Sequence, residues 1–299
     1  MMKEKKLSLK SNKKIAIVYR IHSPAAVKMA KKVSETLKLK KYHIYTAPEQ
    51  KTIAGTKTVV SSNELKDMSL IIVLGGDGTY LRAVRLLRGH PVPILGFNMG
   101  SLGFLTSHPV SEIFEVIEQT LKNDMVLESR SRLHTLVKLK SGKKVAFDAL
   151  NDIVIERGSF SQLISTSVYY NKNYVNDIKA DGLIISTPTG STAYNLAAGG
   201  PILHPEVKAI VVTAVAPHSL SSRPLIFPDH QALTLKLEKQ TNTAHLIIDG
   251  QKVLELSPED EVTITRCEKN HLMIRKPNHN FFSLLKEKLK FGDRYASGT

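Results

Sequence analysis

The sequence predicts an α/β protein of two domains, the first built on a parallel sheet and the second mostly antiparallel and rich in β-strands. Short apolar runs alternate with helical stretches up to about residue 121, which is typical of a parallel sheet covered by helices on both faces. From residue 133 onward, short strand-like runs follow one another, several with alternating apolar and polar residues, and this period is typical of antiparallel strands. A length of 299 residues suits two domains of ordinary size.

In the first domain, apolar runs predict strands and the stretches between them predict helices. The predicted strands span residues 15–19, 42–45, 70–74 and 93–97. The predicted helices span residues 25–39, 80–87 and 111–121. Ser111 is expected to cap the last of these helices.

The second domain is predicted from a series of short strands. They span residues 133–140, 145–147, 152–156, 165–170, 183–186, 210–215, 232–237, 245–248, 253–256 and 261–266. A final helix at 281–289 has Phe282, Leu285 and Leu289 on one face and is expected to return to the first domain. The predicted organisation is a basic leader (1–13), an α/β domain (14–125), a β-rich domain (126–278) and a C-terminal segment (279–299).

The charge of the chain is strongly basic and unevenly distributed. The sequence contains 42 Lys and Arg against 27 Asp and Glu, a formal net charge of +15. Residues 1–57 alone hold 15 basic and 3 acidic residues, so the excess lies mainly at the N-terminus and does not by itself indicate a nucleic-acid groove. Two interpretations stay open: a solvated lysine-rich start, or a basic face that attracts polyanions.

Cysteine content and hydropathy point to the cytoplasm. A single cysteine, Cys267, excludes an intrachain disulfide and a CxxC metal site. No apolar run follows the basic first residues, so a secretory signal is not expected. The stretch between Asp181 and Glu206 carries no charge, but its Gly and Pro residues exclude a membrane-spanning helix.

A glycine-rich turn is the strongest local feature. Gly75-Gly76-Asp77-Gly78-Thr79 follows a predicted strand and precedes a predicted helix. Its glycines let backbone N–H groups approach an anion, and the helix N-terminus favours a phosphate there. In such a loop Asp77 would accept a hydroxyl proton as a general base or help to hold Mg²⁺ through water. The alternative is a tight turn in which Asp77 caps the helix.

Two further segments are candidates for ligand binding. The run at residues 96–105 contains three glycines and also follows an apolar strand, so it is expected to share one sheet edge with the Asp77 turn, unless it is a connecting loop only. The segment at residues 181–201 carries six hydroxyl side chains between residues 186 and 194. Because unpaired hydroxyls are costly to bury, they either cap local turns and a helix starting near Ser191, or bind a polar ligand.

These motifs resemble the signatures of the NAD kinase family. Gly75-Gly76-Asp77-Gly78-Thr79 resembles the family's Gly-Gly-Asp-Gly-Thr motif, which diacylglycerol and sphingosine kinases share in part, whereas residues 181–201 resemble a highly specific second signature. With residues 98–105 and 281–285 the resemblance covers about residues 14–292. It implies a Rossmann-like, phosphofructokinase-like first domain and a β-rich domain that binds most of the NAD, with the active site in the crevice between them.

The implied reaction is ATP-dependent phosphorylation of the adenosine-ribose 2′-hydroxyl of NAD, which gives NADP. In this reading Gly75, Gly76, Gly78 and Thr79 form the phosphate loop and Asp77 is the general base. Mg²⁺ or another divalent cation neutralises phosphate charge. None of the 11 His residues forms a ligand pair near these motifs, so no protein metal site is expected.

The resemblance also implies contacts with NAD from the second domain. Asn151-Asp152 matches the family's Asn-Glu pair with a shorter carboxylate, and Asp181 matches the acceptor at the nicotinamide end. Lys179 stands where many bacterial members carry Arg and lacks the planar fork of Arg. The remaining implied contacts are Gly78, Thr192, Ala193, Tyr194, Asn195, Ala197 and Gln251. Asn151-Asp152 also reads as a turn at a strand edge, and the residues before Gln251 as a hairpin turn.

The expected partners are NAD and ATP, with polyphosphate as an alternative donor and a homodimer or homotetramer as the assembly. A membrane or nucleic-acid partner is not expected. Three other functions stay open on the sequence: a lipid kinase, which residues 181–201 argue against; a catalytically silent dinucleotide sensor, which an intact Asp77 argues against; and a nucleic-acid-associated protein that uses its basic start.

Overall fold

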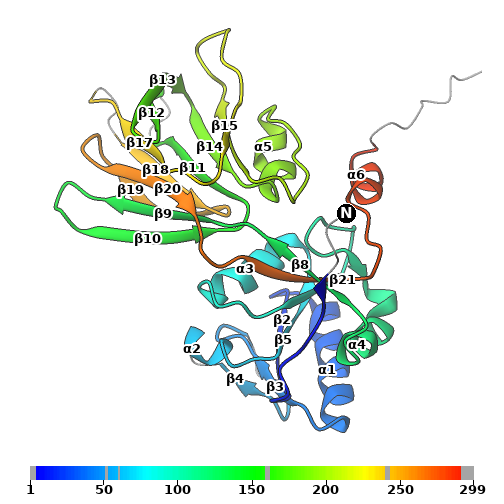
Figure 1. Ribbon diagram of the computed structural model, residues 1–299. Coiled ribbons are helices and arrows are strands. Elements are labelled where there is room, and N and C mark those ends of the chain that lie inside the picture. Colours follow the sequence, from blue (N-terminus) through cyan, green and yellow to red (C-terminus); the bar gives the residue numbers. More distant parts are fainter. Residues whose placement is uncertain (1–4, 51–52, 60, 159–161, 240–242, 291–299) are drawn as a thin grey trace, which may run out of the picture. The chain divides into compact units, whose positions relative to one another are not determined.

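The computed structural model describes residues 5–50, 53–59, 61–158, 162–239 and 243–290. The chain forms two compact units, one of Met1–Ser129 with His271–Thr299 and one of Arg130–Asn270 (Figure 1). Each unit has a hydrophobic core of its own. The predicted α/β fold class, with a largely parallel first sheet and an antiparallel β-rich second part, is confirmed.

The first unit is built on a nine-stranded sheet, counted over the described residues. Its strands are β1 (Lys5–Lys6), β2 (Lys14–Tyr19), β3 (His43–Thr46), β4 (Lys57–Thr58), β5 (Leu70–Gly75), β6 (Ile94–Asn98), β7 (His108–Pro109), β8 (Val126–Arg130) and β21 (His271–Arg275). The order is β1-β8-β21-β6-β5-β2-β3-β4, and β7 pairs with β6. The central strands β21, β6, β5, β2 and β3 are parallel. The strands β2, β5 and β6 at the centre are almost entirely buried, as expected for a sheet with two covered faces.

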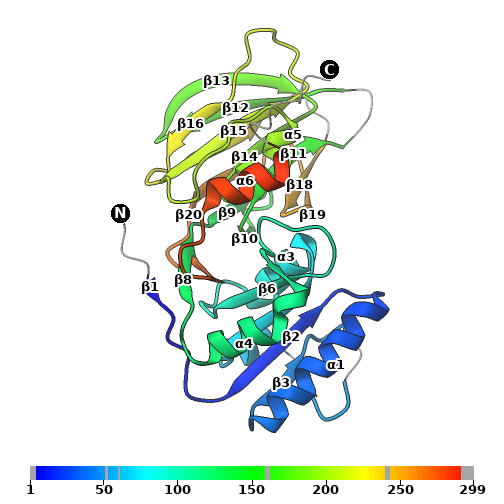
Figure 2. The ribbon, with the colours of Figure 1, turned by 90° about the vertical axis from the view of Figure 1, so that its right-hand side faces the viewer.

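Helices cover both faces of this sheet. The helices of this unit are α1 (Pro24–Leu39), α2 (Ser62–Leu65), α3 (Asp77–Leu87), the 3-10 helix η1 (Val110–Glu112), α4 (Ile113–Leu121) and α6 (Phe281–Leu289), and α1, α3 and α4 are the ones that cover the sheet. Odd-numbered residues of β2, such as Ile15 and Ile17, share one core with the buried stripes of α1 and α4. Figure 2 shows α1 beside β2 and β3. The helix α3 packs on β5 and β2, with Tyr80 directly over Gly96 of β6.

Local sequence explains where the helices begin. Ser23 caps α1 by accepting a hydrogen bond from the N–H of Ala26 at 3.3 Å, and Pro24 occupies the first turn. Ser111, in contrast, lies inside η1 and provides no cap, because α4 begins two residues later at Ile113. The expectation that Ser111 caps this helix is therefore wrong.

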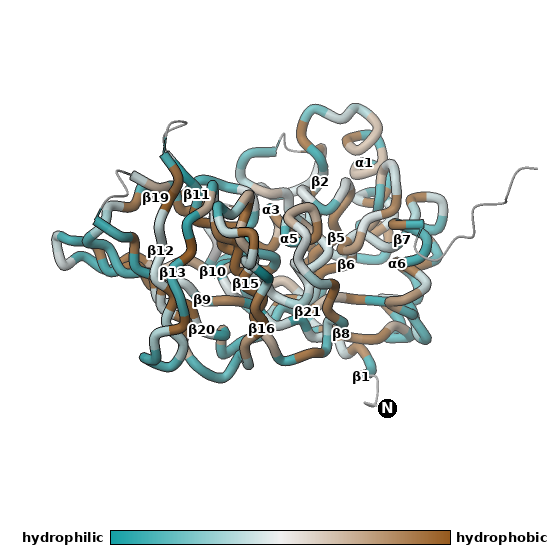
Figure 3. Tube along the Cα trace, turned by 90° about the horizontal axis from the view of Figure 1, so that it is seen from above, coloured by the Kyte–Doolittle hydropathy of each residue, from teal (hydrophilic) through white to brown (hydrophobic). Residues whose placement is uncertain are grey.

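The second unit consists of two six-stranded antiparallel sheets around one core, counted over the described residues. One sheet has the order β10-β9-β20-β17-β12-β13 and comprises β9 (Leu133–Lys138), β10 (Lys144–Ala149), β12 (Ile164–Tyr170), β13 (Asn173–Ala180), β17 (Leu233–Leu237) and β20 (Glu261–Arg266). The other has the order β16-β15-β14-β11-β18-β19 and comprises β11 (Asp152–Arg157), β14 (Gly182–Ser186), β15 (Ala209–Val215), β16 (Leu225–Pro228), β18 (Ala244–Ile248) and β19 (Gln251–Leu256). Figure 3 shows hydrophobic segments along the strands and hydrophilic segments at the hairpin tips.

The two units divide the chain at points that differ from the expected domain limits. The strands β8 and β21 fall within the expected β-rich domain (126–278) but pair in the sheet of the first unit. The strand β1 lies in the expected leader and pairs with β8. The reason is burial: Met125 and Ile274 belong to the core of the first unit, and Leu127 packs against it. The segment that contains α6 also belongs to this unit.

No helix among the described residues is both long and apolar enough to cross a membrane.

Candidate active site

The turn that carries Asp77 connects β5 directly to α3. Gly76 has an extended backbone and is the N-cap of α3, so Asp77 is the first helical residue, three residues earlier than the sequence predicts. An acidic residue in the first helical turn is favoured by the helix dipole. A Cβ placed on Gly76 or Gly78 would meet no atom within 4 Å. The backbone at these two glycines is therefore open to an approaching anion.

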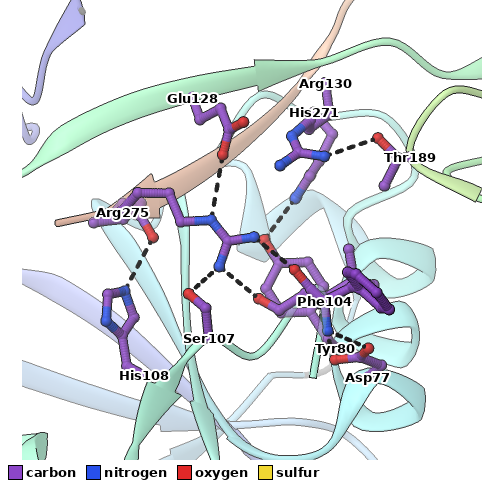
Figure 4. A network of polar contacts seen from close by, with 12 residues as sticks. Asp77, Tyr80, Phe104, Ser107, His108, Glu128, Arg130, Thr189, His271 and Arg275 are labelled. Carbon is purple, nitrogen blue, oxygen red and sulfur yellow. Dashed lines mark hydrogen bonds and ion pairs between the residues drawn. The ribbon is translucent and has the colours of Figure 1, made fainter. Parts of the chain in front are cut away.

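The Asp77 carboxylate is held by the second glycine-rich segment, as Figure 4 shows in part. Its Oδ1 accepts hydrogen bonds from the N–H of Leu105 (3.1 Å) and from the N–H and hydroxyl of Thr106 (3.0 and 2.9 Å). Its Oδ2 accepts one, from the N–H of Phe104 at 2.9 Å. The two segments therefore meet at one sheet edge, as the sequence predicts. Oδ2 keeps the greater capacity to accept a further hydrogen bond.

Glycine at position 103 makes this contact possible. A Cβ at Gly103 would lie 2.1 Å from Asp77 Oδ1 and 2.5 Å from the hydroxyl of Thr106. Asn98, at the end of β6, steadies the same segment, because its amide donates to the Thr106 hydroxyl (3.0 Å) and its oxygen accepts from the N–H of Gly100 (2.6 Å). The carboxylate thus sits in a pre-formed cradle.

A second contact joins α3 to β21. The Tyr80 hydroxyl and His271 Nε2 lie 2.8 Å apart, and the two rings meet edge to face at 5.5 Å. Both side chains are buried. This contact ties the first turn of α3, which begins at Asp77, to the strand that returns from the far end of the chain.

In the second unit, Asp152 lies beside another aspartate. The carboxylate of Asp249 accepts hydrogen bonds from the N–H groups of Leu150 (2.9 Å), Asn151 (2.8 Å) and Asp152 (3.2 Å). Burial, and then the nearby charge of Asp249, raise the pKa of Asp152 to about 7. At neutral pH this carboxyl is poised to exchange a proton or to accept a hydrogen bond from a hydroxyl.

Asn151 presents an acceptor without a protein partner. Its side-chain Oδ1 is buried and makes no hydrogen bond among the described residues. Its backbone C=O accepts from the N–H of Thr187 (2.9 Å) and from the hydroxyl of Ser186 (3.4 Å). A Cβ at Gly190 would lie 2.1 Å from this carbonyl oxygen, so position 190 requires glycine. A buried acceptor of this kind favours a bound donor such as a ligand hydroxyl.

The hydroxyl-rich segment after β14 is held mainly by its own side chains. Thr187 donates to the C=O of Leu150 (2.6 Å), Ser191 to that of Pro188 (2.7 Å) and Thr192 to that of Thr189 (3.3 Å). The hydroxyl of Thr189 accepts from Arg130 (3.4 Å, Figure 4). Of the two alternatives, local capping therefore accounts for most of these groups, and the expected helix near Ser191 is a short 3-10 turn, η2 (Gly190–Thr192), followed by α5 (Tyr194–Ala197).

Asn195 serves the fold at this point. It is completely buried, its amide donates to the C=O groups of Ser191 and Pro201 (both 3.1 Å), and its oxygen accepts from Thr213 (2.7 Å). The neighbouring Tyr194 and Ala197 are exposed, and Thr192 and Ala193 are half-buried. The surface that this segment offers to a ligand is therefore formed by the neighbours of Asn195.

Asp181 lines a cavity that it shares with Tyr194 of this segment. Its carboxylate forms an ion pair with Arg157 at 2.9 Å, and this cavity of about 370 Å³ is also lined by His245. Lys179 lines a second cavity of about 300 Å³ together with Asp177 and Arg223. Gln251 is exposed and follows a hairpin turn in which Asp249 and Gly250 have φ of 47° and 74°. The hairpin reading of this segment is thus confirmed.

Among the described residues, no group of three or more His, Cys, Asp or Glu side chains is arranged to hold a metal ion.

Comparison with known proteins decides the family. A model described as the ATP-NAD kinase N-terminal domain matches residues 15–125, and one described as the ATP-NAD kinase C-terminal domain matches residues 150–276. The chain belongs to the ATP-NAD kinase family. The resemblance inferred from the motifs is confirmed.

Similar ATP-NAD kinase sequences match along almost their whole length. An NAD kinase of Bdellovibrio bacteriovorus is 56% identical over 98% of this chain and 96% of its own. An NAD kinase of Geotalea daltonii is 35% identical over 94% of this chain and 100% of its own. The chain is accordingly a kinase.

Two solved structures share the fold of this ATP-NAD kinase. Yeast NADH kinase, complexed with NADH, matches with a TM-score of 0.87 and 24% identity over 100% of this chain and 91% of its own. An NAD kinase from Archaeoglobus fulgidus, in complex with ATP, matches with a TM-score of 0.72 and 25% identity. The match covers 92% of this chain and 99% of its own.

Sequence reasoning missed three groups that shape these sites in the ATP-NAD kinase chain. They are the N–H groups of residues 104–106, the Asp249 carboxylate and the Arg275 guanidinium. Backbone donors carry no side-chain signature. Asp249 reads as a turn residue, and Arg275 lies in a strand that the periodicity does not reveal.

Proposed function

We propose that this enzyme transfers the γ-phosphate of ATP to the 2′-hydroxyl of the adenosine ribose of NAD and so produces NADP. The observation that carries the proposal is the Asp77 cradle: a carboxylate fixed by four donors at the start of a helix, beside a glycine turn that is open to an anion. Membership of the ATP-NAD kinase family supports the same reaction.

In this proposal Asp77 is the general base. Its less occupied oxygen, Oδ2, accepts the hydrogen bond of the ribose hydroxyl. It takes the proton as the hydroxyl oxygen bonds to the γ-phosphorus of ATP, while the bond from that phosphorus to the β,γ-bridging oxygen breaks and ADP leaves. The turn formed by Gly75, Gly76, Gly78 and Thr79 binds phosphate oxygens through its open positions at Gly76 and Gly78, with help from the dipole of α3. Thr79 supports the turn, since its N–H donates to the C=O of Gly76 at 2.9 Å. Because phosphoryl transfer needs positioning and charge neutralisation more than covalent help, one fixed base and these donors suffice.

A divalent cation, Mg²⁺ in the first instance, would be held at this site mainly by the phosphates of the bound nucleotide. Mg²⁺ commonly keeps several waters and is held by substrate phosphates with one or two carboxylates, and the described residues offer no cluster of three acidic or histidine ligands. Asp77 is the carboxylate that would join such a cation through water. Bound there, the cation supplies charge neutralisation to the phosphates.

NAD is proposed to contact Asn151, Asp152, Lys179, Asp181, Thr192, Ala193, Tyr194, Asn195, Ala197 and Gln251 in addition to Asp77 and Gly78. Among these, the unpartnered Oδ1 of Asn151 and the perturbed carboxyl of Asp152 support binding of a hydroxyl-bearing ligand. Asn195 would contribute by holding the segment, since its side chain is occupied. Polyphosphate stays an alternative donor.

We further propose a cytoplasmic homodimer or homotetramer. Exposed edge strands in the second unit, β13 and β16, are compatible with self-association. Light scattering coupled to size-exclusion chromatography would measure the number of subunits, and a monomeric mass would contradict the proposal.

The deciding experiment is a coupled assay of the purified protein with NAD, ATP and Mg²⁺ in which an NADP-specific dehydrogenase reports NADP. Parallel wells contain NADH in place of NAD, polyphosphate in place of ATP, and EDTA in place of Mg²⁺. NADP formation that requires both the donor and the cation is the expected result. Absence of product while calorimetry still detects NAD binding would overturn the reaction and favour a dinucleotide sensor.

A further inference from the structure

Arg275, at the end of β21, is a charged side chain buried in the first unit, with 1% of its surface exposed. Its Nη2 donates to the C=O of Phe104 at 2.7 Å, and its Nη1 donates to the C=O of Leu105 at 3.4 Å and to the hydroxyl of Ser107. Its Nε faces the Glu128 carboxylate at 3.3 Å (Figure 4). The guanidinium therefore holds the segment that holds Asp77.

The same two peptide groups connect Arg275 to Asp77. In the peptide between residues 104 and 105, the C=O accepts from Arg275 and the N–H donates to Asp77 Oδ1 at 3.1 Å. In the next peptide, between residues 105 and 106, the C=O again accepts from Arg275 and the N–H donates to Asp77 Oδ1 at 3.0 Å. Because C=O and N–H point in opposite directions in a planar trans peptide, each peptide dipole is aligned between a cation and an anion.

We propose that Arg275 is a positioning residue for phosphoryl transfer: it fixes the two peptide groups that orient the Asp77 carboxylate, without touching the reactants. The inference rests on the proposed role of Asp77. It adds a residue about 200 positions further along the chain, brought in by the return of β21 to the sheet of the first unit.

The surroundings of Arg275 explain why the side chain is an arginine. Its planar guanidinium donates to two carbonyls and a hydroxyl while Nε faces Glu128. The single ammonium group of a lysine cannot reach all four of these partners at once. The nearby His108 stays neutral, because burial and then the charge of Arg275 lower its pKa to about 3. Its Nε2 accordingly donates to the C=O of Ile274 at 3.3 Å, which fixes the backbone next to Arg275.

The test compares R275Q and R275K with the parent enzyme and with R132Q. Arg132 is a matched control in the second unit, since it is 5% exposed, donates twice to the C=O of Lys269 (3.1 and 2.9 Å) and faces Asp148 at 3.4 Å. For each protein we would measure kcat and KM for NAD and ATP, the number of NAD sites by calorimetry, and Tm. Normalising kcat to the binding-competent fraction removes losses caused by misfolding.

We expect R275Q to lower the normalised kcat by about 10- to 100-fold, the range that a small misplacement of a catalytic group produces, with KM values changed less than about threefold. R275K should recover part of this loss. R132Q should lower Tm but keep the normalised kcat. If R275Q does not fold, R275K alone tests the proposal, and its normalised kcat is expected to be at least about fivefold below that of the parent enzyme.

Two results would overturn the inference or its basis, and they can be distinguished. A normalised kcat for R275Q and R275K within twofold of the parent, or a loss equal to that of R132Q, removes the positioning role and leaves the proposed reaction intact. A parent enzyme that forms no NADP from NAD and ATP removes the proposed function itself, whatever the variants do.

Discussion

Asp77 lies among hydrogen-bond donors that fix the orientation of its carboxylate. Four donors fix the carboxylate, and three of them crowd on Oδ1. A carboxylate that is immobilised in this way needs little reorganisation when a hydroxyl proton is transferred. As a consequence, the side chain at position 77 must be a hydrogen-bond acceptor, because all four of these neighbouring groups donate a hydrogen to it.

Asp77→Asn is therefore expected to abolish turnover by two routes. It removes the base. It also replaces one carboxylate oxygen with an NH2 group, which faces backbone N–H groups that need an acceptor. We expect kcat to fall by at least about 100-fold while calorimetry still detects NAD binding. The coupled assay measures the first and titration with NAD the second. Turnover within a few fold of the parent would contradict the assigned role.

Asp152→Asn is expected to stabilise the protein in a pH-dependent way. The folded state raises the pKa of Asp152 from 3.8 to about 7, so the native protein loses stability as pH rises through this interval and the carboxyl is forced to ionise. The free energy of unfolding of the variant should exceed that of the parent at pH 8 by up to about 4 kcal/mol. The excess should shrink toward pH 4. Urea titrations at pH 4, 6 and 8 measure it, and a difference independent of pH would refute this explanation.

At this scale the sequence predicts residue types well and their partners poorly. Asp77 and Asn151-Asp152 stand out by motif. The donors to Asp77 lie 27 to 29 residues away along the chain and are backbone groups, and Asp249 is 97 residues from Asp152. Nothing in the local pattern identifies such partners, because they are set by which strands become neighbours.

The second glycine-rich segment is an element whose shape is fixed by one position. Gly103→Ala would place a methyl group 2.1 Å from Asp77 Oδ1, whereas a Cβ at Gly100 in the same segment comes no closer than 3.9 Å to an atom beyond its chain neighbours. We expect the normalised kcat of G103A to fall by about 10-fold or more, since the carboxylate must move. G100A is the matched control and should keep kcat within about twofold. Equal effects of both substitutions would show that the segment, and not this contact, matters.

Elements with a clear period are predicted, and those without one are not. The helices α1 and α6 and the apolar strands β2, β5 and β6 lie within about two residues of the expected limits. The strands that the sequence does not predict include β8, β13, β16 and β21, together with the two-residue strands β1, β4 and β7. β13 is an edge strand with mostly exposed side chains, so no apolar face marks it, and β21 carries His271 and the buried Arg275 in a run too short to show a period.

The whole molecule is organised by a chain that leaves the first unit and returns to it. Residues 130–270 form the second unit, and β21 then takes a place between β8 and β6 in the sheet of the first. Sequence periodicity locates the change of architecture near residues 120–130, and it places the return of the chain at residue 279. Strand pairing shows that the return begins earlier, at β21 (His271–Arg275), which lies within the expected β-rich domain.

This organisation predicts how truncated chains behave. A chain ending at Asn270 lacks β21 and leaves β6 and β8 without their shared neighbour, so its first unit should not fold cooperatively. A chain in which a short Gly-Ser linker joins residue 129 to residue 271 should restore a cooperative thermal transition. Circular dichroism of both proteins tests this, with the unit of residues 130–270 expressed alone as a comparison. A cooperative transition of the first unit without residues 271–290 would contradict the role of β21.

The return of β21 also sets the order of events during synthesis. When residue 129 has been translated, the first sheet still lacks a strand that will be made 142 residues later. At elongation rates of about 5–20 residues per second, the ribosome needs about 7 to 28 seconds to supply it. The antiparallel unit has all its strands at hand before the parallel one does. In this protein the half that begins first is therefore completed last, and during the interval its open strand edge must be protected from other nascent chains.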